Sequence, residues 1–371
     1  MRHPILRPLL PVLLLSSPFA IASELTFYGN LNIALEYRMM ENQNEFPDHY
    51  ELQDTYSSLG VMGSHEIAPG INGFFQYSIY IDAANAELSK SRQVKWAGDV
   101  RSEHNIALVG IEGEYGRLQV GRMWNAYYDR IAYTTDRFYA GWTGFDTYSA
   151  FQTDKTLSYS TPSWHGLDAT INLVQSGVDD PSAETRIIAA GSYALPSGVV
   201  SLGYDSASDG GGEIMAIAGE YQLGAWRLAA KHEIAEPKNA YATKRAGGNK
   251  EASLSSMQVQ FAWQKNTLTL HYGVGDYPSY LPVNRDDDDA YQFGRGSEFG
   301  IGLARDISDH MAVFLEYHHS DDYCAYDVTN GAGNNNYTDS RKVDANGDFI
   351  HNNGEPINGC AVISSGVNYR F

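Results

Sequence analysis

The stretch LTFYGNLNIALEYR, residues 25–38, alternates between apolar side chains and polar or small ones. Its odd-numbered positions include Phe27 and Leu35, and its even-numbered positions include Asn32 and Glu36. A period of two residues is that of a β-strand with one apolar and one polar face. The run is about twice as long as an ordinary strand, which suits a tilted strand that crosses a lipid bilayer.

The same pattern recurs along the chain. Residues 257–264 and 267–274 alternate on either side of Lys265-Asn266, which predicts a β-hairpin with a tight turn. Short connections such as Leu223-Gly224 and Ser308-Asp309 alternate along the chain with long polar stretches. These long stretches lie at 40–51, 236–251, 277–295 and 321–358.

Short turns at one rim and long loops at the other are typical of an outer-membrane barrel. We therefore expect an all-β fold, a transmembrane antiparallel β-barrel of about 16 strands that encloses a water-filled pore. Both chain termini should lie on the short-turn side. A secreted β-sandwich or β-solenoid is the alternative, but strands in such folds are shorter.

Residues 1–22 have the pattern of a cleavable signal peptide. Arg2 and Arg7 give a positive start, an apolar core follows at 9–15, and Ala20-Ile21-Ala22 has the small-x-small form of a cleavage site. We therefore expect a single barrel domain over residues 23–371. That part of the chain has no apolar run of about 18 residues that could form a transmembrane helix.

Net charge limits the partners. The chain carries −19, and loss of Arg2 and Arg7 with the leader makes this −21. We expect no nucleic-acid partner, because phosphate contacts need a basic surface. The sequence also contains no zinc-protease helix motif, nucleophile elbow or phosphate-binding glycine loop. We expect no catalytic residues and no enzymatic activity.

Several short motifs occur in an order and spacing that resemble the general porin family of Gram-negative bacteria. They are LTFYG at 25–29, LGVMGSHE at 59–66, VGI at 109–111, YGRLQVGR at 115–122, LSYSTP at 157–162 and VNYRF at 367–371. The resemblance covers the whole mature chain. It implies an outer-membrane location, a homotrimer, and a third long loop that folds into the barrel.

In this chain the third long loop would span 124–154. It is rich in aromatic residues, namely Tyr127, Tyr128, Tyr133, Phe138, Tyr139, Trp142, Phe145 and Tyr148. A loop of this length should be functional or packed against something. The rings either pack on the inner wall or form a path that binds sugars by stacking.

A pore constriction selects by its size and by the charges that face each other across it. In the family, acidic residues on the inward loop face a basic cluster on the wall across the pore. The resemblance therefore implies that the constriction of this chain is formed by loop acids and wall cations. These are Asp129, Asp136 and Asp146 on the loop, with Arg38, Arg101 and Arg122 on the wall.

Three wall positions that are often basic in the family are neutral here, namely Asn30, Ser58 and Asn105. Fewer positive charges should therefore face the loop acids across the pore, and we expect a weakly cation-selective pore. The alternative is that these acids accept hydrogen bonds from backbone amides inside the loop.

Cys324 and Cys360 stand at the two feet of the last long loop, where we expect a disulfide in an oxidising compartment. Inside this loop, oxygen donors follow the 1, 3, 5, 7, 9, 12 spacing of a calcium loop. They are Asp344, Asn346, Asp348, the backbone oxygen of Ile350, Asn352 and Glu355. Phe349 stands where glycine is wanted, so an ordinary surface loop is the alternative. Apart from this calcium ion, we expect no cofactor.

The sequence thus predicts a passive diffusion channel for ions and small hydrophilic solutes in the outer membrane of a Gram-negative bacterium. A sugar-specific channel is one alternative, and a non-conducting barrel that acts as an adhesin or anchor is another. Expected partners are membrane lipid and lipopolysaccharide, which the acidic run 286–289 could meet through divalent ions. The final Phe371 resembles the signal that the outer-membrane assembly machinery reads.

Overall fold

The computed structural model describes residues 24–39, 48–88, 104–140, 147–175, 185–206, 213–235, 252–278, 293–320, 341–343, 349–351 and 360–371. The strands are β1 (Glu24–Met39), β2 (His49–Asp54), β3 (Ser58–Ala68), β4 (Ile71–Asp82), β5 (Glu87–Leu88), β6 (His104–Gly113), β7 (Gly116–Trp124), β8 (Gln152–Ser160), β9 (Leu167–Val174), β10 (Arg186–Leu195) and β11 (Gly198–Asp205). They continue with β12 (Ile214–Leu223), β13 (Trp226–Ala235), β14 (Ala252–Trp263), β15 (Asn266–Pro278), β16 (Phe293–Asp306), β17 (Met311–Ser320), β18 (Arg341–Val343), β19 (Phe349–His351) and β20 (Cys360–Arg370). Two short helices, α1 (Ala126–Arg130) and the 3-10 helix η2 (Ala132–Thr134), follow β7.

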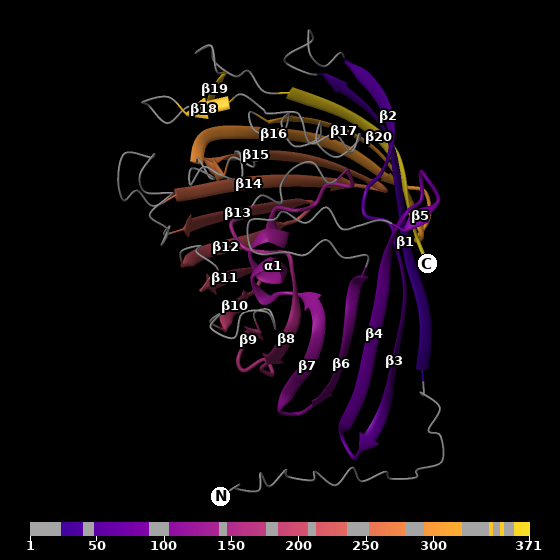
Figure 1. Ribbon diagram of the computed structural model, residues 1–371, viewed down its shortest axis with the longest axis vertical. Coiled ribbons are helices and arrows are strands. Elements are labelled where there is room, and N and C mark those ends of the chain that lie inside the picture. Colours follow the sequence, from indigo (N-terminus) through magenta and orange to yellow (C-terminus); the bar gives the residue numbers. More distant parts are fainter. Residues whose placement is uncertain are drawn as a thin grey trace, which may run out of the picture.

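The strands form a closed antiparallel barrel (Figure 1). β2 and β3 together make one wall strand, because both pair with β1. The two-residue β5 only pairs with the last two residues of β4, so it is not counted as a wall strand. Counted in this way, the wall has 16 strands, as the sequence predicts. β18 and β19 pair separately from the barrel.

Closure joins the two ends of the barrel sequence. β20 pairs with β17 on one side and with β1 on the other, from Asn30 opposite Arg370 to Met39 opposite Ala361. Gly29 and Phe371 exchange two backbone hydrogen bonds of 3.1 Å each. The sheet therefore has no free edge between its first and last strands.

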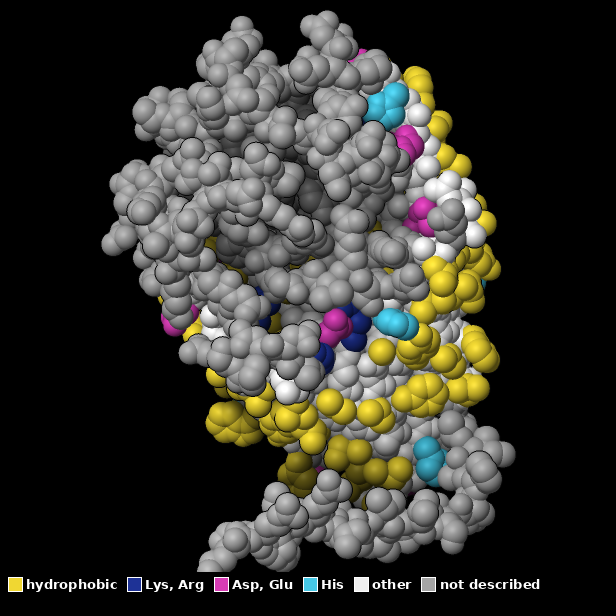
Figure 2. All heavy atoms as spheres, viewed as in Figure 1, with side chains coloured by type: hydrophobic (Ala, Val, Ile, Leu, Met, Phe, Trp, Pro, Cys, Tyr) yellow, Lys and Arg dark blue, Asp and Glu magenta, His cyan; other side chains and the backbone are white. Residues whose placement is uncertain are grey.

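The alternation that predicted the strands places apolar side chains outside and polar ones inside. On β1, Phe27 and Leu35 are 71% and 50% exposed, while Asn32, Glu36 and Arg38 are buried. Figure 2 shows hydrophobic side chains gathered on the outer surface of the strands. This arrangement is inverted relative to a soluble protein and is the one that a lipid surround requires. Among the described residues, no helix is long and apolar enough to cross a membrane.

The predicted hairpin between β14 and β15 forms, with its turn one residue earlier than the sequence suggested. Trp263 pairs with Asn266, so the turn residues are Gln264 and Lys265. Gln264 has φ +53°, a value that a tight two-residue hairpin turn requires. Asn266 therefore belongs to β15.

Candidate functional site: the inward loop and its cavity

The segment after β7 turns into the barrel. We call it the inward loop, described at residues 125–140 and 147–151. Asn125 begins it as the N-cap of α1, since its side-chain oxygen accepts a hydrogen bond of 2.8 Å from the Tyr128 amide. The Ala126 amide donates to the Asn172 side chain of β9 at 2.7 Å. These contacts direct α1 against the inner face of the wall.

A buried carboxylate on β13 holds both limbs of the inward loop. Glu233 accepts hydrogen bonds from the Tyr127 hydroxyl at 3.0 Å, the Thr147 hydroxyl at 2.8 Å and the Tyr148 amide at 3.0 Å. Its other oxygen lies 2.8 Å from the Lys231 ammonium, which is also fully buried. The charge of Glu233 is thus both paired and hydrogen-bonded, as a buried charge must be.

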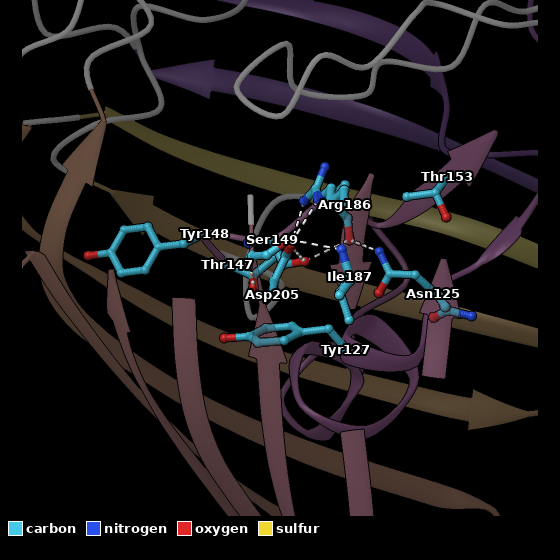
Figure 3. Close-up of polar contacts among 12 residues, drawn as sticks. Asn125, Tyr127, Thr147, Tyr148, Ser149, Thr153, Arg186, Ile187 and Asp205 are labelled. Atoms are coloured by element: carbon cyan, nitrogen blue, oxygen red, sulfur yellow. Dashed lines mark hydrogen bonds and ion pairs between the residues drawn. The ribbon is translucent and has the colours of Figure 1, made fainter. Parts of the chain in front are cut away.

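A second carboxylate, on β11, fixes the returning limb. Arg186 of β10 donates to both oxygens of Asp205, at 2.8 and 2.5 Å, and the Ser149 hydroxyl donates to Asp205 at 2.6 Å. Figure 3 shows this cluster beside Tyr127 and Tyr148. The two-point contact between arginine and carboxylate orients the acceptor for Ser149.

The far part of the inward loop reaches the opposite wall. Glu316 of β17 accepts hydrogen bonds of 2.8 Å from the amides of Tyr139 and Ala140. Asn32 of β1 donates to the Tyr139 carbonyl at 2.6 Å, and the Tyr139 ring stacks on Phe314 with centroids 5.1 Å apart. The loop therefore lies against the inner wall from β9 to β17 and β1.

Of the loop acids predicted for the constriction, Asp129 and Asp136 lie inside the barrel. Asp129 is exposed to solvent inside the barrel, but the protein around it displaces enough water to raise its pKa to about 6, an effect opposed by the charge of Arg130. Asp136 accepts a hydrogen bond of 2.5 Å from the Tyr128 hydroxyl, and burial raises its pKa as well. Asp146 lies outside the described residues.

The predicted wall cations are engaged by acids. Arg38 contacts Glu36 at 2.8 Å and Glu51 at 3.4 Å. Arg122 contacts Asp154 at 2.6 Å and also binds Gln152 and the His104 carbonyl. Arg101 lies outside the described residues.

Arg122 stands at a β-bulge, which explains why strand parity breaks there in the sequence. The pairing of β7 with β8 shifts between Gly121 and Met123, and Gly121 has φ +137°. The extra residue turns the Arg122 side chain toward the base of the inward loop. Neither Arg38 nor Arg122 lines the cavity described next, so their role in a constriction stays a prediction.

A cavity of about 510 Å³ lies between the inward loop and the wall. Its charged lining residues are Asp136, Arg137, Asp306, Glu316 and Arg370. The sequence could have indicated Glu316 and Arg370, because they fall on the polar parity of their strands. Their meeting with Asp136 could not be predicted, because it depends on the path of the loop.

Aromatic rings make up much of the same lining. They are Tyr56, Tyr80, Trp124, Tyr128, Tyr133, Phe138, Tyr139 and Phe151. Trp124 and Tyr128 have centroids 4.4 Å apart, and Tyr128 lies 6.0 Å from Tyr133. The cavity thus combines flat apolar faces with a few charged and amide groups, the usual composition of a small-molecule site.

A closed barrel with an apolar outer face, a polar inner face and an internal loop beside a cavity defines an outer-membrane channel protein. Comparison with known families agrees: residues 10–323 match the Gram-negative porins, and the chain belongs to this family. It is an outer-membrane β-barrel protein. No curated protein matches the chain significantly.

Solved structures with the same fold include porins of several bacteria. The anion-selective porin of Comamonas acidovorans is 13% identical, with a TM-score of 0.63 over 94% of this chain and 99% of that one. A triple mutant of the Rhodopseudomonas blastica porin is 11% identical, with a TM-score of 0.62 over 94% and 100%. The trimer form of OmpT from Vibrio cholerae is 11% identical, with a TM-score of 0.60 over 94% and 99%.

Several predicted features fall on residues outside the described part of the chain. These are the signal peptide, Cys324 and the calcium-loop residues Asp344, Asn346, Asp348, Asn352 and Glu355. Ile350 lies in β19, and Cys360 begins β20 opposite Ser320. Within the described residues, no group of three or more His, Cys, Asp or Glu side chains is placed to hold a metal. The disulfide and the calcium site therefore stay predictions.

Proposed function

We propose that this porin is a passive diffusion channel for ions and small hydrophilic solutes, with a weak preference for cations. One observation carries the preference: six basic side chains inside the barrel each contact a carboxylate. The pairs are Arg38–Glu36, Arg122–Asp154, Arg130–Asp168, Arg186–Asp205, Arg227–Glu220 and Lys231–Glu233. Pairing cancels much of their positive field at a distance.

The acids of the inward loop are less compensated. Among the described residues, neither Asp136 nor Asp129 forms an ion pair: Asp136 accepts its hydrogen bond from the neutral Tyr128 hydroxyl, while Arg137 and Lys231 act on it only at longer range. Asp129 is exposed to solvent inside the barrel. Asp129, with a pKa of about 6, is mostly ionised at neutral pH, and its charge favours cations in a narrow aqueous gap. The anion selectivity in the name of the Comamonas porin does not argue against this, because 13% identity leaves the luminal charges free to differ.

The test is the reversal potential of planar bilayers in a KCl gradient. Wild type should favour potassium, and the double variant Asp129→Asn with Asp136→Asn should favour it less. Glu114→Gln, in the short turn between β6 and β7, removes an exposed charge outside the cavity lining and should leave the reversal potential unchanged. Anion preference in the wild type would overturn the proposal, and absence of steady conductance would favour a non-conducting barrel.

A homotrimer is proposed in addition. The trimer form of the Vibrio cholerae protein and the apolar outer face of this barrel support it. Conductance that rises in steps of three would test it. A single step per insertion event would contradict it.

Four finer proposals rest on the sequence. Thiol labelling with and without reductant tests the Cys324–Cys360 bridge, and calcium calorimetry on wild type and Glu355→Gln tests the calcium loop. Loss of surface assembly in Phe371→Ala would support an assembly signal there. Contact with lipopolysaccharide through the acidic run 286–289 would weaken when divalent ions are chelated.

A further inference from the structure

Two aromatic residues of the cavity lining, Tyr133 and Tyr56, remain exposed. The Tyr133 side chain is 43% exposed, with one face covered by the Arg137 guanidinium 3.8 Å from the ring centroid. Tyr56 is 42% exposed, and its ring lies 6.4 Å from that of Tyr80. Rings that packed only to fill the wall would be covered, so their exposure favours a binding role.

Backbone strain supports a binding role for Tyr56. It stands between β2 and β3, where the wall strand is interrupted, and has φ +67°. A bulky residue in the left-handed region is strained and marks a turn or a functional site. The interruption re-aims this ring into the cavity lining, as bulges do beside active sites.

Two buried polar atoms of cavity-lining residues have no hydrogen-bond partner within the described part of the chain. They are the acceptor Oδ1 of Asn32 and the donor Nε of Arg137. Such atoms have lost their hydrogen bonds to water on folding and have gained no replacement, which is destabilising. Both are covered by neighbouring atoms, so the Asn32 or Arg137 side chain must rotate before a ligand can reach them. A ligand that both donates and accepts hydrogen bonds would satisfy the two.

The lining also indicates which ligand charge fits. Asp136, Asp306 and Glu316 line the cavity together with Arg137 and Arg370, so a carboxylate ligand would meet acids as well as bases. A neutral ligand avoids this repulsion. A pyranose sugar has flat C–H faces that can stack on the aromatic rings. It also has hydroxyl groups that can hydrogen-bond to polar atoms such as those of Asn32 and Arg137.

We propose that this cavity binds pyranose rings of neutral oligosaccharides as they pass through the barrel. Its volume of about 510 Å³ lies in the usual range for small-molecule sites. The inference rests on the proposed channel, because a sugar must enter the lumen to reach Tyr133 and Tyr56. It adds a binding step to simple diffusion.

The experiment measures block of KCl conductance by maltotriose in planar bilayers. Poly(ethylene glycol) of matched mass controls for size, and sorbitol supplies hydroxyls without a ring. Saturable block by maltotriose alone supports the inference. Equal, linear reduction by all three overturns the inference but leaves the channel intact.

Absence of KCl conductance would overturn the proposed channel instead. Intrinsic fluorescence then tests the cavity directly: maltotriose should change it in the wild type but not in Trp124→Phe. No change in the wild type would overturn the inference as well.

Variants locate the site. Tyr133→Ala should weaken maltotriose block about tenfold, the worth of one stacked ring. Arg137→Lys keeps the charge but removes the Nε donor, so it should weaken block without changing ion selectivity. Tyr193→Ala removes an exposed ring from β10, outside the cavity lining, and should leave block unchanged. Equal block in Tyr133→Ala and wild type would overturn the assignment.

Discussion

Replacing Glu233 by Gln should loosen the inward loop from β13. The carboxylate accepts hydrogen bonds from Tyr127, Thr147 and Tyr148, which stand on both limbs of the loop. Gln has nearly the same shape but no charge; its oxygen can accept the three bonds only as a neutral group, and its amide nitrogen then faces the Lys231 ammonium. It also leaves the buried Lys231 without its counter-charge.

The magnitude follows from the number of contacts. A hydrogen bond to a charged group stabilises by about 1.5–3 kcal/mol, and a neutral one by about 0.5–1.5 kcal/mol. Loss of charge at three bonds should therefore weaken docking of the loop by about 3 kcal/mol. The population of locally opened loop should then rise about 150-fold.

Hydrogen–deuterium exchange measures this directly. The Tyr148 amide, which donates to Glu233, should exchange faster, while amides of β14 and β15 keep their protection. The double variant Lys231→Met with Glu233→Gln removes the unpaired ammonium and isolates the loop effect. Glu112→Gln, which loses a half-exposed partner of Arg117 on the wall, serves as the surface control. Unchanged exchange at Tyr148 in both Glu233 variants would refute the reasoning.

Three other predictions follow from single residues. The pKa of Asp129 is raised to about 6, so its charge is lost as pH falls from about 7.5 to about 5. The preference for potassium should therefore decrease over this window in the wild type, and this decrease should be smaller in Asp129→Asn. A wild-type reversal potential independent of pH would contradict this prediction. Gly121→Ala would place a methyl group 2.0 Å from the Ala107 carbonyl oxygen, at a backbone φ of +137° that alanine rarely adopts. The barrel should therefore unfold at a lower temperature, which the gel mobility of heated samples measures. An unchanged midpoint temperature of unfolding would argue against a rigid bulge. Phe371→Gly keeps the backbone hydrogen bonds with Gly29 but removes the aromatic ring. The folded barrel should keep its thermal stability while assembly into the membrane becomes less efficient, which separates strand pairing from the assembly signal.

The barrel itself was predictable from sequence because its cause is local. Alternation within residues 25–38 determines which face meets lipid, and the lengths of connections determine which rim they occupy. Arg122 was a partial case: the break in parity was visible, but the bulge at Gly121 that causes it was not.

The contacts of the inward loop were not predictable. Tyr127 and Glu233 meet through the closed barrel, and no periodic pattern relates positions so far apart in the chain. Tyr56 is similar, because its left-handed backbone follows from how β2 and β3 share one partner strand. By contrast, the Arg38–Glu36 pair could have been found, since residues two apart on a strand share a face.

The seam between β1 and β20 has a consequence for how the protein is made. Until β20 exists, β1 and β17 are both exposed edges, and each offers a row of unpaired amides and carbonyls to any other strand. A shortened chain is thus an open sheet prone to sticking to its neighbours rather than a smaller channel. The barrel gains its protection from aggregation in one step, with the last strand, and the cell must shield every chain up to that moment.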